Sequence, residues 1–235
     1  MMWYPEGEEE LEELIDGYFK QKAEKPAKIN GVIVPHAGYI FSGAVAGKAF
    51  GMLKGKKAEK AVVLGPTHYY FLDDAVTTGK RQWETPLGKI KVFNNGFYEM
   101  DIEQEHSVKN QIPFLQKLGV KEVLPLVVGE ISEKQAKEIA ENISKIDAVY
   151  VFSTDLSHYL PQKNAVEADR QTIKIIEKLD EKKFAKVNAC GIFPLMILLH
   201  LCKIKKTKPK LVEYKNSGDI TGETAGVVGY ASFWF

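Results

Sequence analysis

Short apolar runs that alternate with stretches of helical periodicity constrain the fold of this chain more than any other feature. The runs at residues 31–34, 61–64 and 148–152 are built mainly from Val and other apolar residues, with hardly a polar side chain among them. A strand that is buried on both faces has this continuous pattern, which is typical of a parallel sheet covered by helices on both sides. The sequence therefore predicts an α/β fold with a mainly parallel or mixed central sheet and helices on both faces.

The remaining elements are expected from the same periodicities. Helices are expected at residues 8–22, 42–53, 107–118, 132–143, 164–179, 180–188 and 191–202. Ser42 is the expected N-cap of the second helix. Further strands are expected at residues 122–128, 210–216 and 224–235, and a β-hairpin between residues 75–78 and 89–93, on either side of ETPLG. No linker rich in Pro, Gly or Ser divides the chain, so we expect one domain over residues 1–235.

Charge and hydropathy argue against two classes of binding partner, nucleic acids and membranes. The formal net charge is +1, which argues against a nucleic-acid-binding surface or a basic membrane face. No apolar stretch approaches the roughly 18 residues that a transmembrane helix needs. The first residues, MMWYPEGEEELEEL, are acidic where a signal peptide would be basic and then apolar. We therefore expect a cytoplasmic protein whose partner is a small molecule or a peptide.

Histidines follow three of the predicted strands, at the point where each strand ends. The segment VIVPHAGY contains His36, AVVLGPTHYY contains His68, and AVYVFSTDLSHY contains both Asp155 and His158. Because the carboxyl ends of parallel strands meet at one edge of a sheet, these side chains are expected to share one site. Neutral imidazoles that converge with a carboxylate or a thiolate are typical of a metal centre.

Other side chains near these motifs have more than one interpretation. His106 precedes a predicted helix, so it could cap that helix, pair with Glu105 or line the shared site. His200 lies in the apolar segment MILLHLC and is interpreted as a hydrogen-bonded core residue. Three tyrosines directly follow the histidine motifs and are expected to shape the pocket: Tyr39, Tyr69 and Tyr159.

The two cysteines differ in context. Cys190 and Cys202 lie near opposite ends of a predicted helix, about 18 Å apart, which is too far for a disulfide. Cys190 stands at the expected N-terminus of that helix, where the macrodipole would lower the pKa of the thiol and favour metal binding. A small buried residue is the alternative interpretation of Cys190. Cys202 is expected to be inert packing.

A family resemblance covers nearly the whole chain, from the segment MWYP to the closing strand. In order, its motifs are VPHAGYIFSG, LGPTHY, TPLG, EHSVKNQIPFLQ, FSTDLSHY, CGIFPL and NSGDITGETAGVVGY. Together they resemble the Memo family. That family is in turn similar to the class III extradiol dioxygenases, non-haem iron(II) enzymes that open catechol-type rings, and it shares their α/β fold.

The resemblance implies a set of roles. His36 and His68 would match the two metal-binding histidines, and His158 would match the acid/base histidine, with Asp155 orienting it or competing as a ligand. Cys190 stands where the ring-cleaving enzymes have glutamate, and a thiolate ligand extends the metal preference from iron(II) to copper or, less favourably, zinc. The implied function is a metal-dependent oxidoreductase. The alternative is a non-enzymatic protein whose vestigial cleft binds a peptide or a metabolite.

Overall fold

A mixed β-sheet with a parallel centre organises the protein. The computed structural model describes residues 3–20, 26 and 28–235. Its central strands are β1 (Gly31–Val34), β8 (Val149–Ser153), β2 (Lys60–Pro66) and β7 (Glu122–Val128). Each is hydrogen-bonded in parallel to the next, in the spatial order β1-β8-β2-β7. The predicted α/β architecture with a mixed, mostly parallel central sheet is confirmed.

Further strands, mostly in antiparallel pairs, extend both sides of this centre. The full path is β10-β11-β1-β8-β2-β7-β3-β6, while β9 pairs with β11, and β5 pairs with β4 and β7. The added strands are β3 (Ala75–Thr77), β4 (Gln82–Thr85), β5 (Gly88–Val92), β6 (Tyr98–Glu99), β9 (His158–Leu160), β10 (Lys210–Asn216) and β11 (Val227–Trp234). The chain ends in β11, which lies antiparallel to β1.

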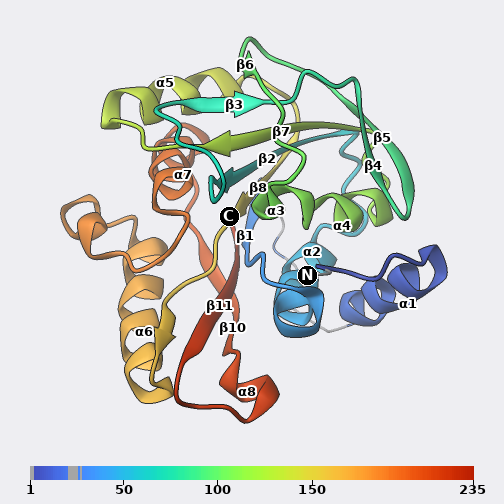
Figure 1. Ribbon diagram of the computed structural model, residues 1–235. Coiled ribbons are helices and arrows are strands. Elements are labelled where there is room, and N and C mark those ends of the chain that lie inside the picture. The colour runs from blue at the N-terminus through green and yellow to red at the C-terminus, as the bar shows by residue number, and fades with distance from the viewer. Residues whose placement is uncertain (1–2, 21–25, 27) are drawn as a thin grey trace.

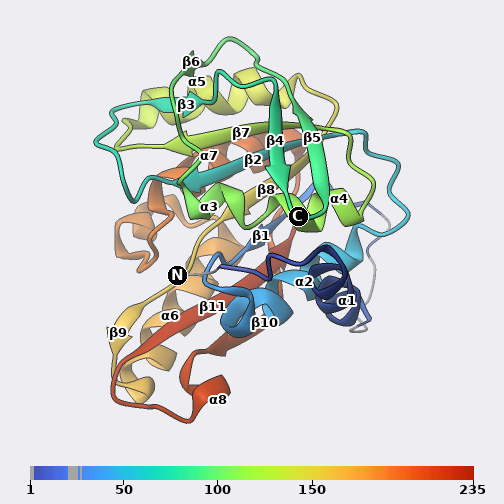
Figure 2. The same cartoon turned by 45° about the vertical axis from the view of Figure 1, so that its right-hand side comes forward.

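Helices cover both faces of the sheet (Figure 1). One face carries α5 (Glu133–Ser144), α6 (Gln162–Lys178), the 3₁₀ helix η2 (Glu181–Lys186) and α7 (Ile192–Lys205). The other carries α1 (Glu8–Phe19), the π-helical segment η1 (Tyr39–Gly43), α2 (Ala44–Met52), α3 (His106–Lys109) and α4 (Ile112–Lys117). A short helix, α8 (Gly218–Thr221), follows β10 and lies at the far end of the long β10–β11 ribbon (Figure 2).

Strand alternation creates two hydrophobic cores. Successive side chains of a strand point to opposite faces, so Val62 and Leu64 pack under α5 and α7 while Ala61 and Val63 pack under α2 and α4. All of these side chains are buried. This double burial explains the continuous apolar runs in the sequence.

Two helix predictions were wrong in detail. Ser42 does not cap α2, because the chain already coils from Tyr39 onward and the Ser42 hydroxyl donates instead to the Ala37 carbonyl at 2.9 Å. The helix expected at 107–118 is divided into α3 and α4. Pro113 has no N–H to donate to the carbonyl four residues back, and α3 ends at Lys109, where that bond would have formed.

The hairpin prediction was also wrong in its first strand. The partner of β5 is β4, with Trp83 directly opposite Ile90, and both side chains are buried. The segment expected to pair there, 75–78, instead contributes β3 to the main sheet beside β7.

The predicted helix 8–22 ends at Phe19, and its positions 21 and 22 lie outside the described residues. None of the helices in the described part of the chain combines the length and apolar composition that crossing a bilayer requires.

We predict that Phe114→Ala lowers the free energy of unfolding by about 3–5 kcal/mol in urea denaturation, because it leaves a cavity in the core. The Phe114 ring is 1% exposed and stacks on Phe50 at 4.7 Å and on Tyr39 at 4.8 Å between centroids. Phe71→Ala is the matched control, since Phe71 is fully exposed. Equal, small losses in both variants would contradict this account of the core.

Candidate metal centre

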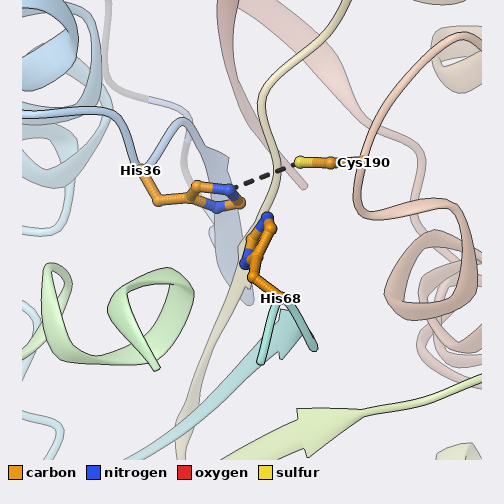
Figure 3. Close-up of side chains that lie close together, drawn as sticks. All are labelled: His36, His68 and Cys190. Carbon is orange, nitrogen blue, oxygen red and sulfur yellow. Dashed lines mark hydrogen bonds between the residues drawn. The ribbon is translucent and has the colours of Figure 1, made fainter. Parts of the chain in front are cut away.

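Two histidines and a cysteine converge at the carboxyl edge of the central strands (Figure 3). His36 follows β1, His68 follows β2, and Cys190 lies just before α7. One ligand-capable atom from each lies within 4.8 Å of the others, and the Cys190 Sγ is 3.3 Å from the His36 Nε2. The three residues therefore form a possible His/Cys metal-binding group.

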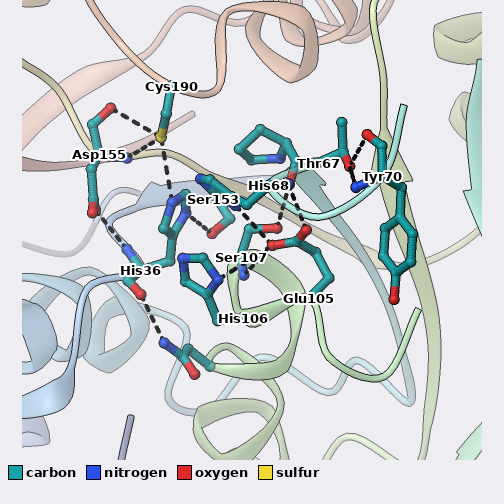
Figure 4. Close-up of polar contacts among 12 residues, drawn as sticks. His36, Thr67, His68, Tyr70, Glu105, His106, Ser107, Ser153, Asp155 and Cys190 are labelled. Atoms are coloured by element: carbon teal, nitrogen blue, oxygen red, sulfur yellow. Dashed lines mark hydrogen bonds and ion pairs between the residues drawn. The ribbon is translucent and has the colours of Figure 1, made fainter. Parts of the chain in front are cut away.

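Hydrogen bonds at Nδ1 hold both imidazole rings in place (Figure 4). The His36 Nδ1 lies 2.9 Å from the Ser153 hydroxyl, and the His68 Nδ1 lies 2.8 Å from a Glu105 carboxylate oxygen. The Glu105 carboxylate also accepts the His68 backbone N–H at 2.7 Å. Metal-binding histidines usually hold the nitrogen that does not bind the metal in this way, which leaves Nε2 as the metal-binding atom.

These distances suit a transition metal. Ligands at about 2.1 Å for imidazole and about 2.3 Å for thiolate, spread at a tetrahedral angle, lie about 3.6 Å apart. The observed 3.3 Å between the sulfur and the His36 Nε2 is close to that value. Nitrogen and sulfur donors together exclude a site built for magnesium or calcium, which prefer oxygen ligands.

A buried polar scaffold supports the centre from the break between α3 and α4. The Asn110 amide donates to the His36 carbonyl at 2.7 Å, and the Gln111 amide donates to both the Pro35 carbonyl and the Ser153 hydroxyl at 3.0 Å. These supporting residues were not predicted from the sequence. Their only sequence signal is the pair of amides ahead of a proline in EHSVKNQIPFLQ.

Burial keeps the clustered imidazoles neutral. The pKa of His36 lies well below its usual value, first because the ring is buried and then because His68, His106 and His158 lie close enough to oppose its charge. Burial, followed by the charge of His68, lowers the pKa of His106 to about 4. Neutral imidazoles are the form that binds metals.

The expected lowering of the Cys190 pKa was wrong. Burial of the thiol, followed by the nearby Asp155 carboxylate, raises the Cys190 pKa to about 12. The sulfur is enclosed by the Asp155 N–H at 3.2 Å and by the His36 ring, and α7 begins two residues later, at Ile192. Desolvation therefore outweighs the helix macrodipole, and a bound cation, rather than the helix, is what would favour the thiolate here.

Asp155 connects two of the candidate ligands. Its carboxylate accepts the His36 N–H at 2.8 Å, and its carbonyl accepts the Cys190 N–H at 3.2 Å. Burial raises the pKa of its carboxyl to about 7. Asp155 thus holds the backbone of both ligands in place.

The other predicted residues are buried to different degrees. His158 is half-buried on β9, near enough to His68 for their charges to interact. Tyr159 is 80% exposed, and Tyr69 is 51% exposed with its ring edge-on to His106. Tyr39 is buried instead, and its hydroxyl donates to the Asn110 carbonyl at 2.7 Å, so it stabilises the polar scaffold and does not shape the pocket.

His106 is the fourth imidazole at this edge. Its ring stacks on Trp3 with a centroid distance of 4.1 Å and lies 4.3 Å from the His68 ring. Its Nδ1 is 3.4 Å from Glu105, which itself caps α3 by accepting the Ser107 N–H at 3.3 Å. Of the three interpretations of His106, lining the site agrees with this geometry. Helix capping does not, because Glu105 is the N-cap of α3. The His106 Nδ1 has no hydrogen-bond partner among the described residues, so its contact with Glu105 is not a hydrogen bond.

The remaining histidine and cysteine lie elsewhere, on α7. The His200 Nε2 is 2.8 Å from a Glu133 carboxylate oxygen. Cys202 is fully buried in the core beneath α5 and α7. Neither contributes to the group formed by His36, His68 and Cys190.

Comparison with known proteins shows which family the chain belongs to. A family model described as "Memo-like protein" matches residues 2–234. The chain belongs to the Memo family. It is 31% identical to a "MEMO1 family protein" of Nitrosopumilus maritimus, over 99% of this chain and 96% of that protein. Proteins with the same description from Methanococcoides burtonii and Sulfolobus acidocaldarius are 36% and 35% identical, over 86% of this chain and over 84% and 81% of their own lengths.

We predict that Glu105→Gln in this Memo-family chain lowers the affinity for a transition metal about 10–100-fold without abolishing binding, because it removes the carboxylate that orients His68. Anaerobic calorimetry with iron(II) measures the change. Glu103→Gln is the matched control, since the Glu103 carboxylate pairs with Lys80 at the surface. An unchanged affinity in Glu105→Gln would show that His68 does not depend on this carboxylate.

Proposed function

We propose that this protein is a metal-dependent oxidoreductase that holds iron(II) or copper, in preference to zinc, between His36, His68 and Cys190. The observation that carries the proposal is the spacing of the three donor atoms, all within 4.8 Å of one another, with both imidazoles anchored at Nδ1. The soft thiolate favours copper, while imidazole suits both metals. The substrate class we propose is a small organic molecule, with catechols as the first candidates.

The metal, when bound, would supply redox chemistry and a Lewis-acid site for a substrate oxygen. Three protein ligands leave coordination positions for a substrate. The residues of the chain supply the rest of the chemistry. Asp155 and Ser153, both buried, exclude water from one side of His36 and hold it in place.

His158 is the proposed proton-transfer group. It is half-buried and, because burial lowers its pKa, its ring is neutral and able to accept a proton from a substrate hydroxyl at neutral pH. A positive charge on His68 would lower the pKa of His158 further, which supports a location within the same site. Tyr69 and Tyr159, exposed on the loops that carry these histidines, are proposed to contact the substrate.

One feature supports the alternative function, a non-enzymatic protein that binds a peptide or a metabolite. Tyr69 and Phe71 follow His68 along the chain, Tyr159 follows His158, and all three expose large aromatic side chains. Aromatic side chains at a surface are typical of recognition sites. In this alternative the metal and the histidines would only organise the binding surface.

We predict that His36→Ala, His68→Ala and Cys190→Ser each abolish stoichiometric binding of iron(II) or copper, because each removes one donor. Metal analysis and anaerobic calorimetry on untagged protein measure this loss. His200→Ala and Cys202→Ala serve as matched controls, since both residues lie on α7 outside the donor group. Stoichiometric binding that persists in two of the three donor variants would remove those residues from the ligand set.

We further predict that the metal-loaded protein consumes dioxygen with at least one catechol, and that His158→Gln slows this reaction about 10²–10⁴-fold, the usual contribution of a general acid or base. The variant should bind the metal with unchanged affinity. Oxygen-electrode measurements decide between the two functions. No oxygen uptake across a panel of catechols, together with saturable binding of peptides or metabolites, would favour the non-enzymatic alternative.

A further inference from the structure

One aromatic side chain on the loop between β2 and β3 has no structural role in the fold. Phe71 is fully exposed, although the next residue, Leu72, packs against a hydrophobic core. Phe71 offers no donor atom and belongs to neither core, so neither metal binding nor packing explains its position. A single exposed apolar residue needs no explanation by itself. The evidence for a function comes from the surroundings of Phe71.

Hydrogen bonds hold the loop in place directly after Phe71. The Leu72 carbonyl accepts the Glu130 N–H, and the Asp73 carbonyl accepts the Gln135 side-chain amide, both at 2.8 Å. These bonds connect the loop to the segment between β7 and the first turn of α5 (Figure 1). Because the loop is already ordered, a partner that contacts Phe71 costs the protein little conformational entropy.

A surface hollow of about 830 Å³ lies beside Phe71. Its other apolar lining residues are Leu72 and Ile131, and its charged lining residues are two exposed carboxylates, Asp73 and Glu130. A volume of this size lies within the range of about 300–1,000 Å³ that is usual for ligand pockets. Among the described residues no basic side chain lines the hollow, which therefore combines apolar contact surface with negative charge.

The two carboxylates have no partner of opposite charge within the described part of the chain. The lysines nearest to Asp73 and Glu130 in the sequence are Lys80 and Lys134, and each of these pairs with a different glutamate. Exposed carboxylates are well hydrated and need no partner. Here, however, both line the same hollow as an exposed aromatic ring, so one cation can contact a carboxylate and the ring together.

The N-terminus of α5 lies at the same hollow and would by itself favour an anion. Ser132 and Gln135 form a capping box, in which each side chain accepts the backbone N–H of the other. Glu133 adds a negative charge to the first turn. This end of the helix is therefore already compensated, and the unpaired carboxylates of Asp73 and Glu130 determine which charge the hollow attracts.

A guanidinium group fits this combination better than an ammonium group does. It stacks on aromatic rings and pairs with a carboxylate through two parallel hydrogen bonds. It is also weakly hydrated, whereas an ammonium group is strongly hydrated and has no planar fork of donors. An apolar side chain next to the arginine would cover Leu72 and Ile131. The hollow thus matches a peptide segment that carries both kinds of side chain.

We propose that this hollow is a docking site for a segment of a partner protein that carries arginine beside apolar side chains. The guanidinium group stacks on Phe71 and pairs with Asp73 or Glu130, while an apolar side chain packs on Leu72 and Ile131. The site requires no metal and contains none of the candidate metal ligands. It is therefore compatible with either function proposed for the metal-binding group.

Fluorescence anisotropy on metal-free protein tests the proposal, with a labelled hexapeptide of alternating leucine and arginine that is blocked at both ends. We expect saturable binding that weakens as salt is added. Affinity should be at least about tenfold higher than for the same peptide with glutamine in place of arginine. Nuclear magnetic resonance should show shifts at the backbone amides of residues 71–73 and 130–132. No saturable binding, equal binding of the glutamine peptide, or shifts confined to other surfaces would overturn the proposal.

Two variants remove the proposed contacts at exposed positions, where the fold does not depend on the side chain. Phe71→Ala is expected to weaken binding of the arginine peptide about 5–10-fold, because it removes the stacking surface. Asp73→Asn combined with Glu130→Gln is expected to weaken it by a similar factor, because it removes both charges. Unchanged affinity in either variant would contradict the proposed contacts.

Control variants separate this site from the rest of the surface and from the metal-binding group. Ile220→Ala changes an exposed apolar residue of α8, and Glu9→Gln combined with Glu13→Gln changes two exposed acidic residues of α1. Both should bind the arginine peptide like the wild type, and an equal loss in either would mean non-specific binding and overturn the proposal. His36→Ala should also bind it unchanged, since a loss there would place the peptide at the metal-binding group instead. The docking proposal and the metal proposal therefore fail in different experiments.

Discussion

Parallel pairing of β1, β8 and β2 places their carboxyl ends at one edge of the sheet, and the candidate metal centre depends on that arrangement. His36 and His68 come from β1 and β2, which are separated by β8. Ser153, the last residue of β8, therefore lies between them and binds the His36 Nδ1. Cys190 reaches the same point by a hydrogen bond from its backbone N–H to the carbonyl of Asp155, just beyond β8. Residues far apart in the chain, such as His36 and Cys190, which are 154 positions apart, meet because the strands run in the same direction.

Burial determines the charge state of this cluster. The pKa of His36 is lowered, while the pKa values of Asp155 and Cys190 are raised to about 7 and about 12, in each case mainly because the group is desolvated. All three shifts favour the neutral form. A bound divalent cation would favour the charged thiolate and carboxylate over their neutral forms, while the imidazoles must still be neutral to bind it. The protein thus stabilises the donor set by hydrogen bonds to Ser153, Glu105 and Asp155, and the charge of the metal would stabilise the anionic sulfur.

The sequence predicted those features that depend on local pattern and strand direction. The apolar runs were sufficient to predict the central strands, and the position of His36 and His68 after two of them was sufficient to predict convergence. The hydrogen bonds that orient these rings could not be predicted, because Glu105 and Ser153 reach them from other parts of the fold. The predicted direction of the thiol pKa shift was wrong for a related reason. The macrodipole is a local property of the helix, whereas the enclosure of Cys190 by Asp155 and His36 depends on the tertiary fold. The break before Pro113 was not predicted, and its consequence, two amides that brace His36 and Ser153, required the structure.

X-ray absorption spectroscopy of the metal-loaded protein tests the central claim, that sulfur and two imidazoles share one metal, most directly. The account predicts one sulfur scatterer at about 2.3 Å and imidazole nitrogens at about 2.1 Å, the usual thiolate and imidazole distances. The sulfur contribution should disappear in Cys190→Ser and remain in Cys202→Ala. A first shell of nitrogen and oxygen alone in the wild-type protein, or a sulfur contribution that survives in Cys190→Ser, would contradict the account.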